Sequence, residues 1–212
     1  MKKIALLAVA AILVSFQCDA QNNLSNLFKK AASAVTKNTD SSSSSILNTI
    51  TSLIANNKVD EFQIAGNWNY SGAAISFKSE NALSNIAGTV AEGTIEKKID
   101  TYLNKLGIKP NAFKMNFASD GTVQMTVGSK RWNGTWTYEK TGAQVTLKFA
   151  KLITIRAYVA ISGGELKLLF EANGLLKLVK SIASVSSNTT ISALSSVLNS
   201  YNELYAGFRM TK

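Results

Sequence analysis

Three carboxylates have the spacing in this sequence that is best suited to chemistry. Glu92, Glu96 and Asp100 follow one another at intervals of four residues, which would place them on one face of a helix. Such a group could gather a hard cation, because Ca²⁺ and Mg²⁺ prefer oxygen ligands. However, Lys97 and Lys98 lie alongside, and charged residues opposite an apolar stripe are typical of a solvated helix face. We therefore interpret the three carboxylates as a solvated stripe and predict no metal site.

Residues for other catalytic chemistry are scarce. The chain contains no histidine and a single cysteine, Cys18, whereas nucleophilic and acid–base catalysis usually draw on one of these two residue types. The stretch Ser162-Gly163-Gly164 fits a hairpin turn and not a phosphate-binding loop. The sequence thus predicts a protein that is not an enzyme, has no catalytic residues and uses no cofactor.

The aromatic residues are the other candidates, because most of them fall on alternating positions. If the strands that carry them enclose a space, they would line a cavity for a lipid, another hydrophobic small molecule or a glycan fragment. The alternative is a barrel interior that its own side chains fill, since eight strands leave just enough room for them. The candidate ligand-binding residues are Trp68, Tyr70, Trp132, Trp136, Tyr138, Met115 and Met125.

The strands that would hold these residues begin after residue 61, where apolar residues start to recur at every second position. A first strand covers Ala65 to Tyr70 and resumes from Ala73 to Phe77, and the change of phase at Ser71-Gly72 predicts a β-bulge. Six more strands have apolar faces that start at Phe113, Val123, Trp132, Val145, Ile153 and Leu166, and an eighth covers Leu204 to Met210. Short loops keep every inward face in phase: three residues at 119–121 and 150–152, and four at 128–131, 139–142 and 162–165.

Helical patterns interrupt these strands at two places. The first covers Ser79 to Leu106 and stops at Gly107; the second is a pair of helices around Leu175–Ile182 and Ile191–Leu198. Eight antiparallel strands in hairpin order can close into a barrel, which removes the exposed sheet edges. We therefore predict an α+β, mainly β fold. It is an eight-stranded antiparallel up-and-down β-barrel with a long helix inserted after strand 1 and a helical pair before strand 8.

The N-terminus predicts export. Lys2 and Lys3 precede the apolar run Ile4–Val14, which is too short to span a bilayer and is typical of a secretory signal peptide. Small residues at Cys18 and Ala20 favour cleavage after Ala20, so that Cys18 would leave with the signal peptide; the alternative is a lipoprotein anchored at Cys18. We expect a periplasmic or secreted protein.

The next forty residues carry two amphipathic helical patterns, Leu24–Val35 and Ile46–Ile54, on either side of the serine tract Ser41–Ser45. These two helices could dock on the barrel or stay mobile, and in the alternative function described below their apolar faces dock an envelope protein partner. The net charge is +10, but the lysines are dispersed, so we predict no nucleic-acid partner and no transmembrane segment. The predicted domains are a signal peptide over 1–20, a helical N-terminal segment with a Ser-rich linker over 21–60, and a barrel domain over 61–212.

Gly66-Asn67-Trp68 matches the Gly-x-Trp that opens the first strand of lipocalin-like barrels, in which an arginine on the last strand packs over the tryptophan. Arg209 is the matching candidate for such a Trp68–Arg209 pair. More closely, "AGNWNYSGAAISFKSENALSNIAG", "DGTVQMTVG", "TLKFA" and "SVSSNTTISALSSVLNSY" resemble a family of uncharacterised, lipocalin-like exported proteins of Bacteroidetes-type bacteria. This resemblance covers residues 60 to 212 and implies a fold and an envelope location, with no established activity.

Two functions are compatible with this sequence. The first is non-catalytic binding of a hydrophobic or amphipathic small ligand in or at the mouth of the barrel. The alternative is an envelope structural or interaction protein with a solid barrel, whose partner docks through the N-terminal helices.

Overall fold

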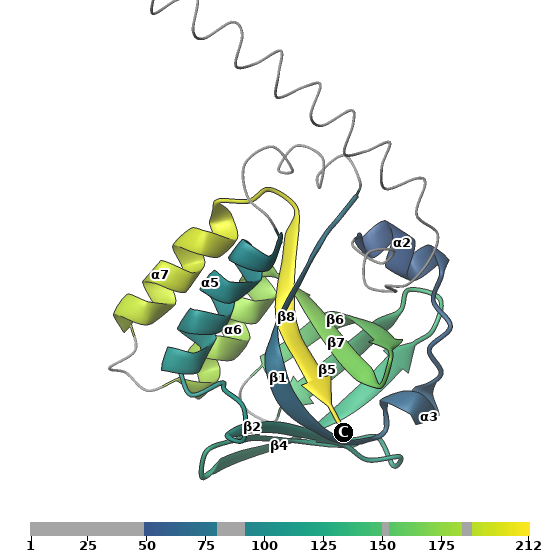
Figure 1. The fold of residues 1–212 in the computed structure, drawn as a ribbon. Coiled ribbons are helices and arrows are strands. Elements are labelled where there is room, and N and C mark those ends of the chain that lie inside the picture. Colours follow the sequence, from purple (N-terminus) through teal and green to yellow (C-terminus); the bar gives the residue numbers. More distant parts are fainter. Residues whose placement is uncertain (1–48, 80–91, 150–152, 184–187) are drawn as a thin grey trace, which may run out of the picture. The chain divides into compact units, whose positions relative to one another are not determined.

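Eight antiparallel strands form a closed barrel in the computed structural model, each paired with its neighbours in the sequence (Figure 1). The structure describes residues 49–79, 92–149, 153–183 and 188–212. This architecture confirms the predicted eight-stranded up-and-down barrel. The strands are β1 (Gly66–Phe77), β2 (Phe113–Phe117), β3 (Thr122–Val127), β4 (Lys130–Glu139), β5 (Gln144–Phe149), β6 (Ile153–Ser162), β7 (Glu165–Glu171) and β8 (Leu204–Thr211).

The hairpins keep the predicted inward faces, although three turns differ from the prediction. The three-residue loop at 119–121 is confirmed, with Gly121 at φ 82° as its left-handed residue. Two predicted four-residue loops are in fact two-residue turns, 128–129 and 163–164. Gly163 and Gly164 have φ values of 59° and 80°, as a type I′ turn requires. The β4–β5 loop covers 140–143, one residue later than predicted, and 150–152 lies outside the described residues.

Strand β1 is shared between two neighbours. Its first residues pair with β2, and those from Asn69 to Phe77 pair with β8, with a register shift between Tyr70 and Gly72 that confirms the predicted β-bulge. Because β1 parts from β2 beyond Asn69, one side of β1 is left without a strand partner. Helix α5 (Glu92–Lys105) packs against β1 at this point. The backbone N–H of Ile75 donates to a Glu96 carboxylate oxygen at 3.4 Å.

Three helices lie together beside the barrel (Figure 1). Helix α5 ends at Lys105, one residue before the predicted end, and the stop residue Gly107 follows at φ 88°. Helices α6 (Ala172–Ile182) and α7 (Asn188–Asn199) confirm the predicted pair before the last strand. The part of the first predicted helix before Glu92 lies outside the described residues. Within the described ranges, none of the helices has the length and apolar character needed to cross a membrane.

The chain from Thr49 to Ile64 packs on the barrel. Helix α2 (Ile50–Ala55) buries Ile50 and Leu53 in a cluster with Ala74, Leu169 and Tyr205 from the outer face of the strands. Helix α2 therefore uses its apolar face on the barrel itself, which is one of the possibilities that the Ile46–Ile54 pattern left open. The Leu24–Val35 pattern lies outside the described residues.

Side chains after α2 continue this attachment. The Asn57 side-chain amide donates to the Tyr138 hydroxyl at 2.8 Å and to the Lys140 carbonyl oxygen at 2.9 Å, and Asp60 forms an ion pair with Lys140. Helix α3 (Glu61–Ile64) then leads into β1. These contacts attach the described residues before residue 61 to the barrel.

Candidate functional site

The predicted ligand-binding residues all lie on inward positions of the barrel. Cross-strand pairs bring Trp68 beside Met115 and Met125 beside Trp132. Trp132 and Tyr138 are half-buried at its margin, and the Tyr138 hydroxyl donates to the Val59 carbonyl oxygen at 3.1 Å. The other five are at most 3% exposed: Trp68, Tyr70, Met115, Met125 and Trp136.

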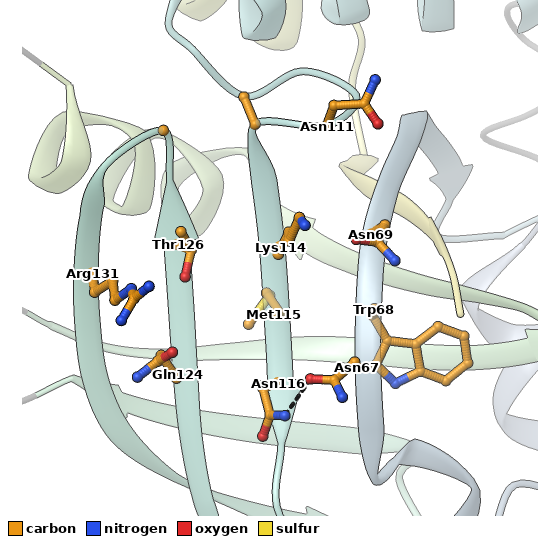
Figure 2. Close-up of a pocket in the computed structure, with 12 residues that line it drawn as sticks. Asn67, Trp68, Asn69, Asn111, Lys114, Met115, Asn116, Gln124, Thr126 and Arg131 are labelled. Atoms are coloured by element: carbon orange, nitrogen blue, oxygen red, sulfur yellow. Dashed lines mark hydrogen bonds between the residues drawn. The ribbon is translucent and has the colours of Figure 1, made fainter.

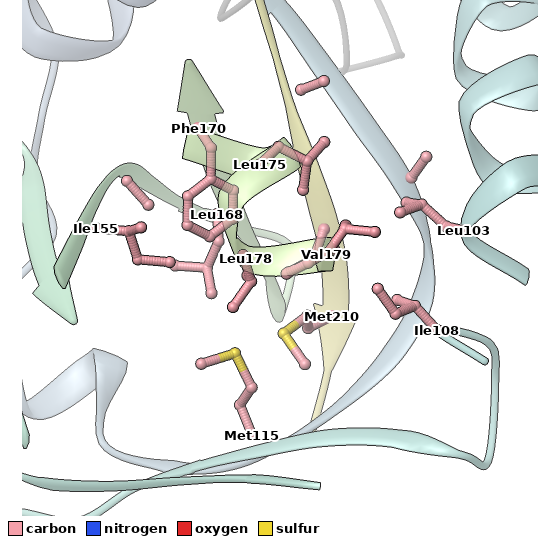
Figure 3. Close-up of a cluster of buried hydrophobic side chains, with 14 of the residues drawn as sticks. Leu103, Ile108, Met115, Ile155, Leu168, Phe170, Leu175, Leu178, Val179 and Met210 are labelled. Atoms are coloured by element: carbon pink, nitrogen blue, oxygen red, sulfur yellow. The ribbon is translucent and has the colours of Figure 1, made fainter. Parts of the chain in front are cut away.

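The inward side chains pack against one another around these residues. The Phe117 ring meets Trp136 edge to face, with 5.4 Å between the ring centroids, and Tyr70 contacts Phe113 and Phe208 in the same way. Helix α6 adds an apolar face from one side (Figure 3), so strands and helix share one continuous core. The residues of this core that Figure 3 labels include Met115, Ile155, Leu168, Phe170, Leu175, Leu178, Val179 and Met210.

The predicted Trp68–Arg209 pair is wrong. The cation over the Trp68 ring is Lys212, whose Nζ lies 4.8 Å from the ring centroid, and Trp68 Nε1 donates to the Ile64 carbonyl oxygen at 2.7 Å. The reason is the position of Arg209 on β8: it lies opposite Gly72, four residues from Trp68 on β1, and it points opposite to the inward Phe208.

Arg209 instead forms an ion pair with α5. Its Nη2 lies 3.1 Å from both carboxylate oxygens of Glu96, and its Nε lies 3.9 Å from Glu165 Oε2. The Glu96 side chain is 26% exposed. This ion pair joins the last strand to the helix that covers the open side of β1.

Asp100 also contacts the barrel. Its carboxylate accepts hydrogen bonds from the Tyr70 hydroxyl at 2.7 Å and from the Asn104 side-chain amide at 3.0 Å. Burial, reinforced by this carboxylate, raises the pKa of Tyr70 well above its usual range. The predicted solvated stripe is therefore wrong for Glu96 and Asp100, whereas the Glu92 side chain lies outside the described residues.

A polar groove of about 580 Å³ lies on the outer face of β1 to β4 (Figure 2). Amides form one cross-strand row along it, in the order Asn67, Asn116, Gln124 and Asn133. Asn116 donates to the Asn67 side-chain oxygen, and Gln124 donates to the Asn133 side-chain oxygen at 2.9 Å. The adjacent row consists of Asn69, Lys114, Thr126 and Arg131.

This groove was not predicted from the sequence, because the candidate residues were those on the inward alternate positions of the strands. The available signal was weak: outward amides and cations at every second position are also what any solvated strand shows. A second, smaller hollow of about 310 Å³ lies where the outer face of β6 meets the start of α6, with Arg156, Tyr158 and Lys177 among its lining residues.

A comparison with protein-family models agrees with the barrel architecture. The sequence model of the family described as "Lipocalin-like domain (DUF4923)" matches residues 16–212. None of the curated proteins matches the chain. The crystal structure of a DUF4847 family protein from Bacteroides vulgatus is similar to 71% of this chain and 94% of its own, with 13% sequence identity and a TM-score of 0.36.

Proposed function

The chain belongs to the lipocalin-like DUF4923 family, and we propose that it is an exported, non-catalytic protein that acts through its outer surface. In this proposal the barrel is a solid scaffold, as in the second of the two functions that the sequence left open. The observation that carries the proposal is the continuous hydrophobic core, to which the candidate ligand-binding residues and the buried residues of α6 both belong. Export is supported by the signal-peptide pattern before Ala20.

The first function, binding of a hydrophobic or amphipathic ligand within the barrel, requires space. Sites for small molecules typically occupy at least about 300 Å³. Here Trp136 and Phe117 are in ring contact, and Leu178 and Val179 of α6 belong to the same buried core. A ligand would have to displace these side chains and would forfeit their packing energy.

The absence of catalysis is supported by how the carboxylates near the barrel are used. Glu96 is paired with Arg209, and Asp100 accepts hydrogen bonds from Tyr70 and Asn104. A general acid or base needs a group within reach of a substrate, whereas these two carboxylates already hold α5 on β1 and β8.

A neutral hydrophobic fluorophore, N-phenyl-1-naphthylamine, tests the solid interior directly. The wild-type protein is expected to give no saturable fluorescence increase. Trp136→Ala should cost about 3–5 kcal/mol of unfolding free energy and open an apolar space beside Phe117, so this variant serves as a control for a barrel that admits the probe. Met125→Ala, which removes a smaller side chain from the same core, provides a second control if Trp136→Ala does not fold.

Saturable one-to-one binding of the fluorophore by the wild-type protein, with displacement by a fatty acid, would contradict the solid scaffold. That result would favour a hydrophobic ligand inside the barrel.

A further inference from the structure

The outer face of the barrel has an uneven distribution of charge. The outward positions of β2 to β6 consist mainly of amides, hydroxyls and cations, and their one carboxylate, Glu139, lies at the far end of β4 beside the turn. Such a surface attracts anions, because positive charges raise the local concentration of anions, most strongly where the surface forms a groove. The four cations on these positions are Lys114, Arg131, Lys148 and Arg156.

Two of these cations lie in the groove on β1 to β4. Lys114 and Arg131 occupy the same cross-strand row, separated by Thr126 of the intervening strand. Neighbouring strands are about 4.8 Å apart, so the two cations bracket a span close to two strand spacings. The groove's lining residues include no carboxylate that would neutralise these cations.

The neighbouring row supplies hydrogen-bonding groups of both kinds. An amide side chain has two N–H donors and a carbonyl acceptor, and each of the two amide–amide bonds, Asn116 to Asn67 and Gln124 to Asn133, uses one donor and one acceptor. The bonds fix the orientation of the four side chains, while their remaining donors and acceptors can serve a ligand. Groups that act as both donor and acceptor complement hydroxyls, which also have both roles.

We propose that this groove binds an acidic oligosaccharide. Ligand carboxylates would pair with Lys114 and Arg131, the latter through the parallel N–H bonds that guanidinium groups form with carboxylates. Ligand hydroxyls would bond to the amide row one step along the strands. The volume of about 580 Å³ is that of a small-molecule site and suits a short saccharide.

A nucleic acid fits this groove less well. Single strands bind to basic grooves through stacking of bases on aromatic side chains. Of the residues that line the groove, Trp68 is the aromatic one, and its ring is buried and directed away from the amide row (Figure 2). The groove thus offers hydrogen bonds and charge but no stacking platform.

The proposal rests on the proposed surface function, to which it adds a ligand class and a site. Two uronate probes test it by calorimetry at physiological ionic strength: trigalacturonic acid and a hyaluronan tetrasaccharide. The matched ligand control is trigalacturonate with every carboxylate methyl-esterified, which keeps its ring hydroxyls and loses its charge. We expect saturable binding of at least one acid, and binding of the trigalacturonate ester that is weaker by about tenfold or more.

Two double variants of equal charge locate the binding. Lys114→Gln with Arg131→Gln should weaken binding of the acid about tenfold or more. Lys148→Gln with Arg156→Gln makes the same charge change on the same face outside the groove, and it should change the affinity by less than about twofold, a screened surface effect. Asn116→Ala should weaken binding without changing the net charge, whereas Thr135→Ala should not.

Several results would overturn the proposal. They are no saturable binding of either acid up to about 10 mM, equal binding of acid and ester, equal losses in the two double variants, or tighter binding of a short single-stranded DNA or an acidic peptide. The fluorophore titration reports separately on the barrel interior. If the wild-type protein binds neither uronate nor the fluorophore, the oligosaccharide proposal is wrong and the proposal of a solid barrel is retained.

Discussion

At the scale of single residues, the polar contacts of α5 decide how the helix is held. Tyr70 projects from β1 into the core and reaches Asp100 with its hydroxyl, while Glu96 accepts from both Arg209 and the Ile75 backbone. The two carboxylates therefore accept hydrogen bonds from donors on the open side of β1: Asp100 from the Tyr70 hydroxyl and Glu96 from the Ile75 backbone N–H. Buried polar groups are costly when unpaired, so these contacts stabilise the junction of helix and barrel.

Alkaline titration should reveal the Tyr70–Asp100 contact. The pKa of Tyr70 is raised in the folded protein, so the neutral phenol favours folding fully below the pKa of free tyrosine, about 10, and this contribution is lost as the pH rises above it. Wild type should therefore lose up to about 1.4 kcal/mol of unfolding free energy per pH unit above pH 10 from this group. Tyr70→Phe should be less stable by about 1 kcal/mol at pH 8, and the gap should narrow at higher pH. Urea denaturation of both proteins at several pH values checks this, and parallel curves would contradict it.

At the scale of elements, the close approach of β7 and β8 at Gly207, in the middle of β8, limits the side chains that this position can hold. A Cβ at Gly207 would lie 1.9 Å from the carbonyl oxygen of Leu168 on β7 and 3.0 Å from the Phe170 ring. Those atoms are backbone and buried core, so neither can move aside easily. Gly72, at the bulge of β1, has nothing within 4 Å of the same position.

Gly207→Ala should therefore destabilise the protein by about 3 kcal/mol or more, or prevent folding, because the β7–β8 ladder must part. Gly72→Ala should change the unfolding free energy by less than about 0.5 kcal/mol. Chemical denaturation of the two purified variants, with expression yield as a second readout, gives the comparison. Equal stability of the two variants would contradict the close approach of β7 and β8 at Gly207.

The strands and the inward residues could be predicted from the sequence because alternation has a period of two and the barrel has one apolar side. The two turn lengths that were wrong, at 128–129 and 163–164, escaped detection because two-residue and four-residue loops keep the same inward faces in phase. The partner of Arg209 could not be predicted, since it lies on α5 and the sequence does not show which strands this helix covers. The apolar stripe of α5 indicated which face of the helix is buried. It did not indicate that Glu96 and Asp100, beside this stripe, would form hydrogen bonds with residues of β1.

At the scale of the whole molecule, the barrel is completed by the segment from Thr49 to Ile64. Ile50, Leu53 and Val59 are each at most 6% exposed, and they cover apolar surface on the outside and at the edge of the barrel. The family match from residue 16 onward also includes this segment. We conclude that the folded unit comprises more than the eight strands and their inserted helices.

Two shortened chains test the role of this segment. A chain that starts at Ser45 should retain the thermal stability of the longer protein. A chain that starts at Glu61 loses the burial of three apolar side chains, at about 1.5–3 kcal/mol each, and should unfold at a much lower temperature. Calorimetry of both proteins at equal concentration makes the comparison, and equal melting temperatures would show that the segment adds little to the barrel.

The most direct measurement of the central claim is native mass spectrometry of the wild-type protein isolated from its own host, followed by the mass of the denatured chain. A solid barrel predicts that no hydrophobic molecule accompanies the native protein. A stoichiometric lipid or other apolar compound that is present in the native spectrum and lost on denaturation would contradict the account and assign the barrel interior to ligand binding.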